Sequence, residues 1–255
     1  MMFSLENKIA VVTGGGSGIG RAISILFAKQ GATVHILELS KDSAAQTLAE
    51  IESAGGKAFT HACDVAKQDD VKKVFEEMGA INILVNNAGI AHIGKADTTS
   101  ENDFDRVMAV NVKGVYNCIH YAIPELRKSG GGVIVNMASI AALVGLSDRF
   151  VYSTAKGAVM SMTMSVAKDY ISENIRCNSV SPARVHTPFV DGFLKNNYPG
   201  REAEMFERLS KTQPIGRMAK PGEVASLVLF LSSDEAGFIT GCDYPVDGGF
   251  IKLQG

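Results

Sequence analysis

A glycine-rich segment, TGGGSGIG at residues 13–20, constrains the fold of this chain more than any other feature of its sequence. The run before it, residues 9–12, is continuously apolar and too short for a helix, which predicts a strand buried on both faces. After it, apolar residues recur at helical spacing until Gly31. A strand, a glycine turn and a helix in this order leave free N–H groups at the positive end of the helix. Because glycines allow close approach, such an end is suited to the pyrophosphate of a dinucleotide.

Strand-like and helix-like runs alternate along the rest of the chain. We predict strands near residues 8–12, 32–38, 58–63, 81–86, 133–138, 175–180 and 243–246. We predict helices near residues 18–30, 41–54, 67–78, 101–127, 152–172 and 221–232. Strict alternation favours a parallel sheet with helices on both faces. Since no repeat or linker divides the chain, we expect one doubly wound α/β domain over residues 1–255, with a mainly parallel seven-stranded sheet.

The segment 183–220 breaks this alternation. It carries Pro188, Pro199 and Pro214 in a mixed polar and apolar stretch. A long segment of weak regularity in a compact domain is typical of a lid or binding loop. The alternative is a surface excursion with one or two short helices.

Composition excludes several classes of protein. Charged residues make up 20% of the chain and the formal net charge is −2, so there is no basic excess to attract nucleic acid. No apolar stretch reaches membrane-spanning length and the N-terminal residues lack a secretory signal, so we expect a cytoplasmic protein with no membrane partner. The four cysteines, which form no metal-binding spacing, are expected to be buried free thiols, and we expect no metal site.

Glu38 ends the second predicted strand, twenty residues after Gly18. In a doubly wound sheet this position faces the adenine ribose, where a carboxylate accepts hydrogen bonds from both hydroxyls and repels a 2′-phosphate. The variable glycine-motif positions 15–17 hold no Arg or Lys to offset that repulsion. The sequence therefore predicts NAD(H) rather than NADP(H), although an acid at a strand end can also be a solvated loop residue.

Tyr152 and Lys156 lie four residues apart at the start of a predicted helix, so their side chains share a face. A nearby ammonium favours a phenolate, which predicts a Tyr152 pKa lowered from about 10 toward neutrality, as acid/base catalysis requires. Ser139 follows a buried strand, where open α/β sheets bind ligands. Taken alone, the spacing of Tyr152 and Lys156 is equally typical of an exposed tyrosine beside a lysine.

Two asparagines are further candidates. Asn87 follows the predicted strand ending near residue 86, and Asn111 lies on an apolar helical stripe, where a buried amide must find partners. Each could contact a ligand or satisfy backbone groups, and both alternatives stay open.

Three cations lie near these candidates, namely Arg149, Arg184 and His186. Cations that face a pocket can bind a carboxylate, phosphate or polyhydroxylated substrate. The alternative is that they point to solvent or pair with neighbouring acids. The substrate itself is not identified by the sequence.

Taken in order, these motifs resemble those of the short-chain dehydrogenases/reductases. The matches are T-G-x-x-x-G-I-G at 13–20, Glu38, Asp64-Val65, N-N-A-G at 86–89, Asn111, Ser139, Y-x-x-x-K at 152–156, Pro182 through Thr187-Pro188, and Val246-Asp247-Gly248-Gly249. The resemblance covers essentially the whole chain. It implies a Rossmann-type fold and a nicotinamide-dependent oxidoreductase.

The resemblance implies a role for each matched residue. Tyr152 is the general acid/base and Ser139 polarises the substrate oxygen. Lys156 holds the nicotinamide ribose and lowers the pKa of Tyr152, and Asn111 positions a water that relays protons to Lys156. The implied cofactor contacts are Gly14, Ser17, Gly18, Ile19, Gly20, Glu38, Asp64, Val65, Asn87, Ala88, Gly89, Tyr152, Lys156, Val185 and Thr187.

We therefore expect an NAD-dependent enzyme that interconverts a secondary alcohol and a ketone, on a sugar, polyol or small hydroxy compound. The resemblance also implies a homotetramer. One alternative is a 3-oxoacyl-thioester reductase, against which Glu38 and the weakly acidic net charge count. Another is a catalytically silent dinucleotide-binding sensor or scaffold, against which the complete set of four catalytic candidates counts.

Overall fold

A seven-stranded sheet forms the centre of the computed structural model, which describes residues 2–253 apart from the side chains of Phe189 and Asn197. Neighbouring strands pair in parallel in the order β3-β2-β1-β4-β5-β6-β7. The strands are β1 (Ile9–Thr13), β2 (Thr33–Glu38), β3 (Lys57–Ala62), β4 (Ile83–Asn86), β5 (Gly132–Met137), β6 (Ile175–Pro182) and β7 (Asp243–Val246). The doubly wound sheet predicted from the alternation is confirmed, and all of its described strands are parallel.

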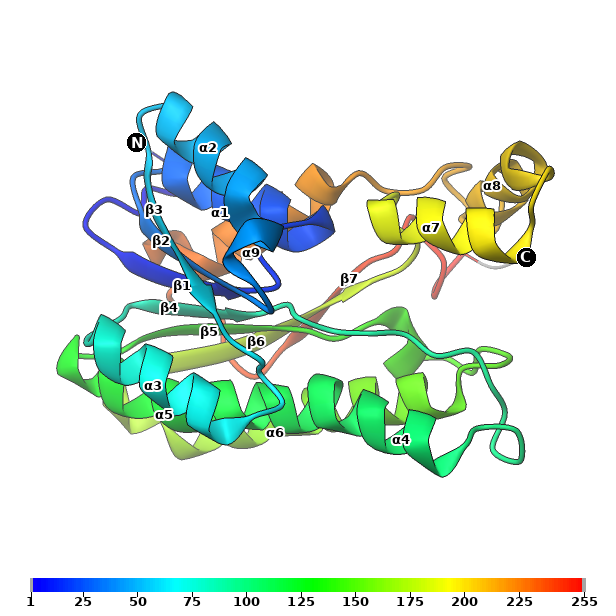
Figure 1. Cartoon of the computed structure of the whole chain (residues 1–255). Coiled ribbons are helices and arrows are strands. Elements are labelled where there is room, and N and C mark those ends of the chain that lie inside the picture. Colours follow the sequence, from blue (N-terminus) through cyan, green and yellow to red (C-terminus); the bar gives the residue numbers. More distant parts are fainter. Residues whose placement is uncertain (1, 254–255) are drawn as a thin grey trace.

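Helices cover both faces of this sheet (Figure 1). On one face lie α1 (Gly18–Lys29), α2 (Ala45–Ser53) and α9 (Pro221–Ser232), with α1 packed along α9. On the other lie α3 (Gln68–Met78), α5 (Gly114–Lys128) and α6 (Phe150–Asp169), and α4 (Glu101–Met108) packs against α6. The last two helices, α7 (Pro188–Asn197) and α8 (Glu202–Ser210), lie together beyond one end of the sheet.

Alternation along β1 explains the two hydrophobic layers. Ala10 and Val12 belong to the cluster that includes side chains of α1 and α9, whereas Val11 belongs to the cluster formed with α3, α5 and α6. All three are fully buried. A strand that buries both of its faces needs a continuously apolar sequence, as predicted for residues 9–12.

The predicted helix 101–127 is wrong in one respect, because it is interrupted. Between α4 and α5 lies a π-helical turn, η2 (Ala109–Lys113), with Asn111 fully buried inside it. The Asn111 amide binds both main-chain polar groups of Ile90, at 2.8 Å each. We attribute the wider turn to this tertiary contact, since π-helical turns arise where the regular hydrogen-bond ladder is perturbed and occur often at functional sites.

The irregular segment 183–220 contains two short helices, α7 and α8, as one of its two alternatives held. One expectation about the cysteines is corrected. Cys63, Cys118 and Cys177 are buried free thiols, but Cys242 is exposed because it precedes β7, which has no further strand beyond it. In the part of the chain that the structure describes, no helix has the length and apolarity to cross a membrane, and no cluster of His, Cys, Asp and Glu could hold a metal ion.

Candidate active site

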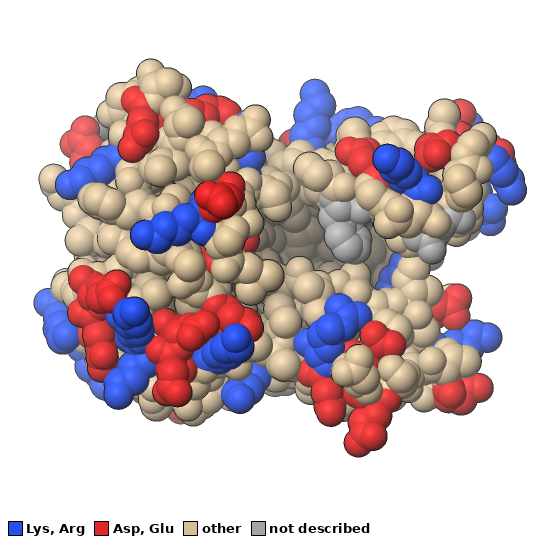
Figure 2. Space-filling view, in the orientation of Figure 1, with Lys and Arg blue, Asp and Glu red and all other residues tan. Residues whose placement is uncertain are grey.

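A cavity of about 560 Å³ lies at the carboxyl ends of the central strands, and Figure 2 shows the molecule hollowed there, beside α7. Every predicted site residue lines it except Gly20 and Asn111. The predicted residues brought together are Gly14, Ser17, Gly18, Ile19, Glu38, Asp64, Val65, Asn87, Ala88, Gly89, Ser139, Tyr152, Lys156, Val185 and Thr187.

The glycine loop fits the pyrophosphate of a dinucleotide. Gly14 and Gly18 have φ of 63° and 53°, a left-handed backbone that glycine adopts without strain. Ser17, at the N-terminus of α1, is extended and forms no side-chain cap, and the first turn of α1 carries no acidic residue. The helix therefore presents uncapped N–H groups and its positive end to the cavity.

Gly20 does not line the cavity, and it lies where a side chain would not fit. A Cβ added to Gly20 would lie 2.0 Å from the carbonyl oxygen of Gly14 and 2.5 Å from Nδ2 of Asn87. Only glycine allows α1 to approach the loop this closely, so Gly20 acts behind the cavity wall.

Thr13 joins the ends of β1 and β4. Its hydroxyl accepts hydrogen bonds from the N–H groups of Asn87 (3.0 Å) and Ala88 (2.9 Å). In return, Nδ2 of Asn87 donates to the carbonyl oxygens of Thr13 (3.0 Å) and Gly14 (3.1 Å). Asn87 thus satisfies backbone groups and also lines the cavity. No role was predicted for Thr13, although its place as the first residue of the glycine motif is a signal.

Glu38 stands at the far end of the cavity, with Asp64 and Val65. Its Oε1 accepts a hydrogen bond from the N–H of Gly16 at 2.9 Å, so the carboxylate is fixed against the glycine loop. Cys63 also lines this end, and burial is the main reason its pKa is raised to about 12, which keeps the thiol neutral. This end of the cavity therefore carries the carboxylates of Glu38 and Asp64, of which Glu38 is fixed.

Ser139, Tyr152 and Lys156 meet at the other end. Ser139 follows β5 and precedes the short turn η3 (Ile140–Ala142), where its Oγ accepts the N–H of Ala141 at 3.2 Å. Tyr152 and Lys156 come from the first turns of α6. Lys156 is only 5% exposed, and its Nζ donates to the carbonyl oxygen of Met137 at 2.6 Å. The three side chains thus come from two neighbouring elements.

The expected lowering of the Tyr152 pKa is not found. Burial raises the pKa of this phenol, and the Ser139 hydroxyl and the Arg149 charge only partly oppose the rise. Lys156 does not reverse it, because its ammonium lies 5.9 Å from the ring centroid and donates to Met137. Burial also lowers the pKa of Lys156 to about 8. Desolvation of both groups therefore outweighs their attraction.

Asn111 lies behind the cavity wall, next to Lys156. A Cβ added to Gly89 would lie 3.3 Å from Oδ1 of Asn111 and 3.6 Å from Nζ of Lys156, so these two polar groups approach each other across Gly89. The asparagine amide satisfies the backbone of Ile90, as one alternative held. Its oxygen and nitrogen each keep capacity for one further hydrogen bond.

The three candidate cations differ in where they lie, since two line the cavity and one does not. His186 is exposed and lies 2.8 Å from Asp191, so the alternative of pairing with a neighbouring acid is correct for this residue. Arg149 and Arg184 line the cavity. An apolar wall completes the cavity, and long-range folding assembles it from four separate segments. Of its members only Phe193, in the segment 183–220, was a candidate from the sequence. Its members are Ile90, Ala91, Ile93, Val190, Phe193, Leu209 and Met218.

Known oxidoreductases are similar to this chain over nearly its whole length. Residues 14–251 match a family model described as enoyl-(acyl carrier protein) reductase. The chain is 38% identical over 259 residues to a cyclohexanol dehydrogenase of Acinetobacter sp. (strain SE19), covering 99% of this chain and 98% of that protein. It is 42% identical over 248 residues to an uncharacterized oxidoreductase of Thermotoga maritima, covering 96% and 98%.

Solved structures agree as well. The structure of Thermoplasma acidophilum aldohexose dehydrogenase matches with a TM-score of 0.87 and 35% identity over 98% of this chain and 96% of that one. L-sorbose reductase from Gluconobacter frateurii, solved with NADPH and L-sorbose, matches with a TM-score of 0.94 and 30% identity over 100% of both chains. Fold and site thus define an oxidoreductase of alcohols and ketones. The chain belongs to the short-chain dehydrogenase/reductase family.

Proposed function

We propose that this protein is an NAD(H)-dependent dehydrogenase that interconverts a secondary alcohol and a ketone, on a sugar, polyol or small hydroxy compound. The convergence of Ser139, Tyr152 and Lys156 on the cavity that begins at the glycine loop carries this proposal. A hydroxyl, a phenol and an ammonium around one space are suited to binding a substrate oxygen and moving its proton.

Residues of this chain suit each part of the dinucleotide. The glycine loop and the N-terminus of α1 would hold the pyrophosphate, Glu38 the adenine ribose and Lys156 the nicotinamide ribose. Asp64 and Val65 would lie at the adenine, Asn87 to Gly89 near the ribose, and Val185 and Thr187 at the carboxamide. When bound, the nicotinamide supplies the hydride donor or acceptor.

The proton chemistry belongs to the chain itself. Ser139 would hydrogen-bond the substrate oxygen, and Tyr152 would exchange a proton with that oxygen. Because burial raises the pKa of Tyr152, its phenol is protonated at neutral pH, the state needed to donate to a ketone. Lys156, with a pKa of about 8, can pass a proton onward near neutral pH, and Asn111 would position the water that receives it.

The fixed carboxylate of Glu38 supports NAD(H) over NADP(H). A 2′-phosphate on the adenine ribose would meet like charge there. The sorbose reductase structure contains NADPH, so cofactor preference must be measured for each chain. Activity on a panel of secondary alcohols with NAD⁺ and with NADP⁺ measures it, and a clear preference for NADP⁺ contradicts this part of the proposal.

Replacement of the phenol tests the chemistry. We expect Tyr152→Phe to lower kcat by about a thousandfold or more, within the range known for acid/base groups acting in concert, while NADH still binds. Tyr170→Phe, which removes a hydroxyl just after α6 and outside the cavity, is the matched control and should keep the parent activity. Turnover of 3-oxoacyl thioesters but not simple ketones would favour the thioester reductase. Tight NADH binding with no turnover of any substrate would favour the silent sensor.

A homotetramer and a cytoplasmic location remain part of the proposal. Exposed apolar side chains on α5 and α6 support an assembly, because Tyr116, Phe150 and Met164 are 46%, 44% and 56% exposed. Light scattering at micromolar concentration should give four times the chain mass. A monomer mass would refute the assembly.

A further inference from the structure

Arg149 and Arg184 come from different parts of the fold to the same cavity as Tyr152. Arg149 directly precedes α6, three residues before Tyr152, and Arg184 follows β6 in the segment that leads to α7. Both side chains are only half-exposed. The cavity therefore holds two guanidinium groups near its candidate catalytic phenol.

Neither arginine has a carboxylate partner among residues 2–253, the masked side chains aside. Arg149 donates through Nη1 to the carbonyl oxygen of Asp148 at 3.0 Å, and Arg184 donates through Nε to Thr212 Oγ1 at 2.9 Å. Other arginines of the chain do form ion pairs, namely Arg21, Arg106, Arg127, Arg201 and Arg217. Most donors of the two cavity arginines remain available to a ligand.

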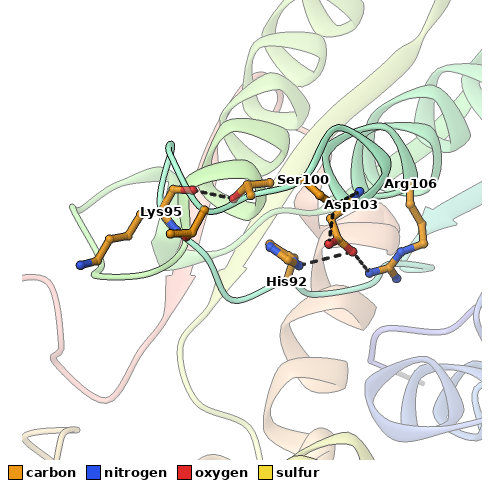
Figure 3. A network of polar contacts seen from close by, with 7 residues as sticks. His92, Lys95, Ser100, Asp103 and Arg106 are labelled. Carbon is orange, nitrogen blue, oxygen red and sulfur yellow. Dashed lines mark hydrogen bonds and ion pairs between the residues drawn. The ribbon is translucent and has the colours of Figure 1, made fainter.

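The backbone at Arg149 is held in place by the loop between β4 and α4. Gly94 and Arg149 form a parallel β-bridge. In Figure 3, His92 and Arg106 converge on Asp103, whose Oδ1 lies 3.7 Å from Nδ1 of His92 and accepts from Nη2 of Arg106 at 3.0 Å. A Cβ on Gly94 would lie 2.7 Å from Nε2 of His92, so this loop is tightly packed.

Arg184 is held in a similar way. Its carbonyl oxygen accepts the N–H of Ala219 at 2.9 Å, and Val185 and Ala219 form a second parallel bridge. Both arginines therefore project from fixed backbone, which lowers the entropic cost of binding a ligand between them.

The charges around this part of the cavity have one sign. The carboxylates that line the cavity, Glu38 and Asp64, belong to the end that suits adenine. Burial lowers the pKa of Arg184, and the charge of Arg149 lowers it further, so the two guanidinium groups are near enough to repel each other. The rest of the wall is largely apolar, with Ile93, Leu209 and Met218 among its members.

We infer that Arg149 and Arg184 form an oxyanion subsite and that the substrate is a hydroxy carboxylic acid, or the corresponding oxo acid, with a short apolar body. A planar carboxylate accepts paired hydrogen bonds from guanidinium groups, and the apolar wall covers the carbon chain. This inference rests on the proposed function and names its substrate class. A phosphate monoester shares the oxyanion chemistry and is separated from a carboxylate by the test.

Turnover by the wild-type protein gives the first test. Short 2-, 3- and 4-hydroxy acids are compared with their primary amides and with hydroxyalkyl phosphates of similar length. We expect at least one acid to exceed its amide by about a hundredfold or more in kcat/KM, since two charge-assisted interactions are involved. Turnover of amides as efficient as that of acids, or a preference for phosphates, would overturn the assignment while leaving the alcohol dehydrogenase activity intact.

Substitution locates the subsite. In Arg149→Met and in Arg184→Met the acid-to-amide ratio should fall by about tenfold or more. Arg208→Met, an exposed arginine on α8 outside the cavity, is the matched control and should keep the ratio. A ratio that stays constant in both cavity variants refutes the subsite. The ratio is independent of the amount of folded enzyme, so partial unfolding does not imitate the effect.

A binding measurement separates this inference from the proposed function. Calorimetry with the NADH-bound protein compares butanoate with butanamide, neither of which can react. Tighter binding of butanoate in wild type, lost in Arg184→Met, supports the subsite even if no alcohol in the panel is oxidised, a result that would refute the proposed function alone. Equal binding of the two probes refutes the subsite.

Discussion

Glu38→Gln should shift the cofactor preference toward NADP(H) without disturbing the fold. Glutamine has the size of glutamate, and its side-chain oxygen can still accept the N–H of Gly16, which donates to Glu38 at 2.9 Å. The substitution therefore removes the charge and keeps the glycine loop. Any change in preference then reports the charge rather than a collapsed site.

The size of the shift follows from two contributions. Two like charges about 5 Å apart repel by roughly 3 kcal/mol at an effective dielectric constant of about 20. Because Glu38 is half-exposed, we halve this value to about 1.5 kcal/mol to allow for solvent screening. Replacing carboxylate–ribose hydrogen bonds with neutral ones weakens NAD(H) by about 1 kcal/mol more. The NADP⁺ to NAD⁺ ratio of kcat/KM should therefore rise roughly 50- to 100-fold.

Initial rates with saturating alcohol and varied cofactor measure this ratio. Glu52→Gln removes the same charge from an exposed position on α2 outside the cavity and should leave the ratio unchanged. A change of less than threefold in Glu38→Gln, with the control also unchanged, would show that Glu38 does not face the ribose. A wild-type protein that already prefers NADP⁺ would refute the reasoning outright.

Two predictions concern stability. Gly20→Ala should lower the free energy of unfolding by about 2 kcal/mol or more in urea titrations, because its Cβ would lie 2.0 Å from the Gly14 carbonyl oxygen, whereas Gly157→Ala on α6, with no atom within 4 Å, should not. Burial, followed by the charges of His61 and Lys57, lowers the pKa of His35 from 6.5 to about 4, so the native state binds fewer protons than the unfolded state between these values. The free energy of unfolding should therefore fall by about 1–2 kcal/mol as the pH drops through this range, and the fall should be smaller in His35→Gln.

Elements with signals inside their own sequence were predicted almost to the residue. The predicted helix 221–232 coincides with α9, which starts at Pro221, and the predicted strand 243–246 coincides with β7. The break between α4 and α5 was not predicted, because it accompanies contacts between Asn111 and Ile90, residues that lie 21 positions apart. A pattern confined to one helix contains no information about such a partner.

The same distinction governs the candidate site. The spacing of four residues correctly predicted that Tyr152 and Lys156 lie on one side of their helix, and both line the cavity. Helical periodicity is a local property, so the sequence contains it. The direction in which the pKa of Tyr152 shifts depends on how much of the fold covers the phenol. There the effect of burial exceeds that of the nearby charge. Spacing alone therefore predicts which groups meet, while the sign of their electrostatic effect requires the tertiary structure.

Arg149 connects the substrate subsite to the proton chemistry. Its charge is one of the two influences that lower the pKa of Tyr152, against the larger effect of burial. An anionic group bound at Arg149 would neutralise that charge, so it would raise the pKa of the phenol further and stabilise its protonated form. An oxo acid in the proposed subsite would then favour the very protonation state that donates to its ketone oxygen. Removing the Arg149 charge by substitution and neutralising it with a bound anion would both raise the pKa of Tyr152. Anion binding at the proposed subsite would therefore also affect proton transfer by Tyr152.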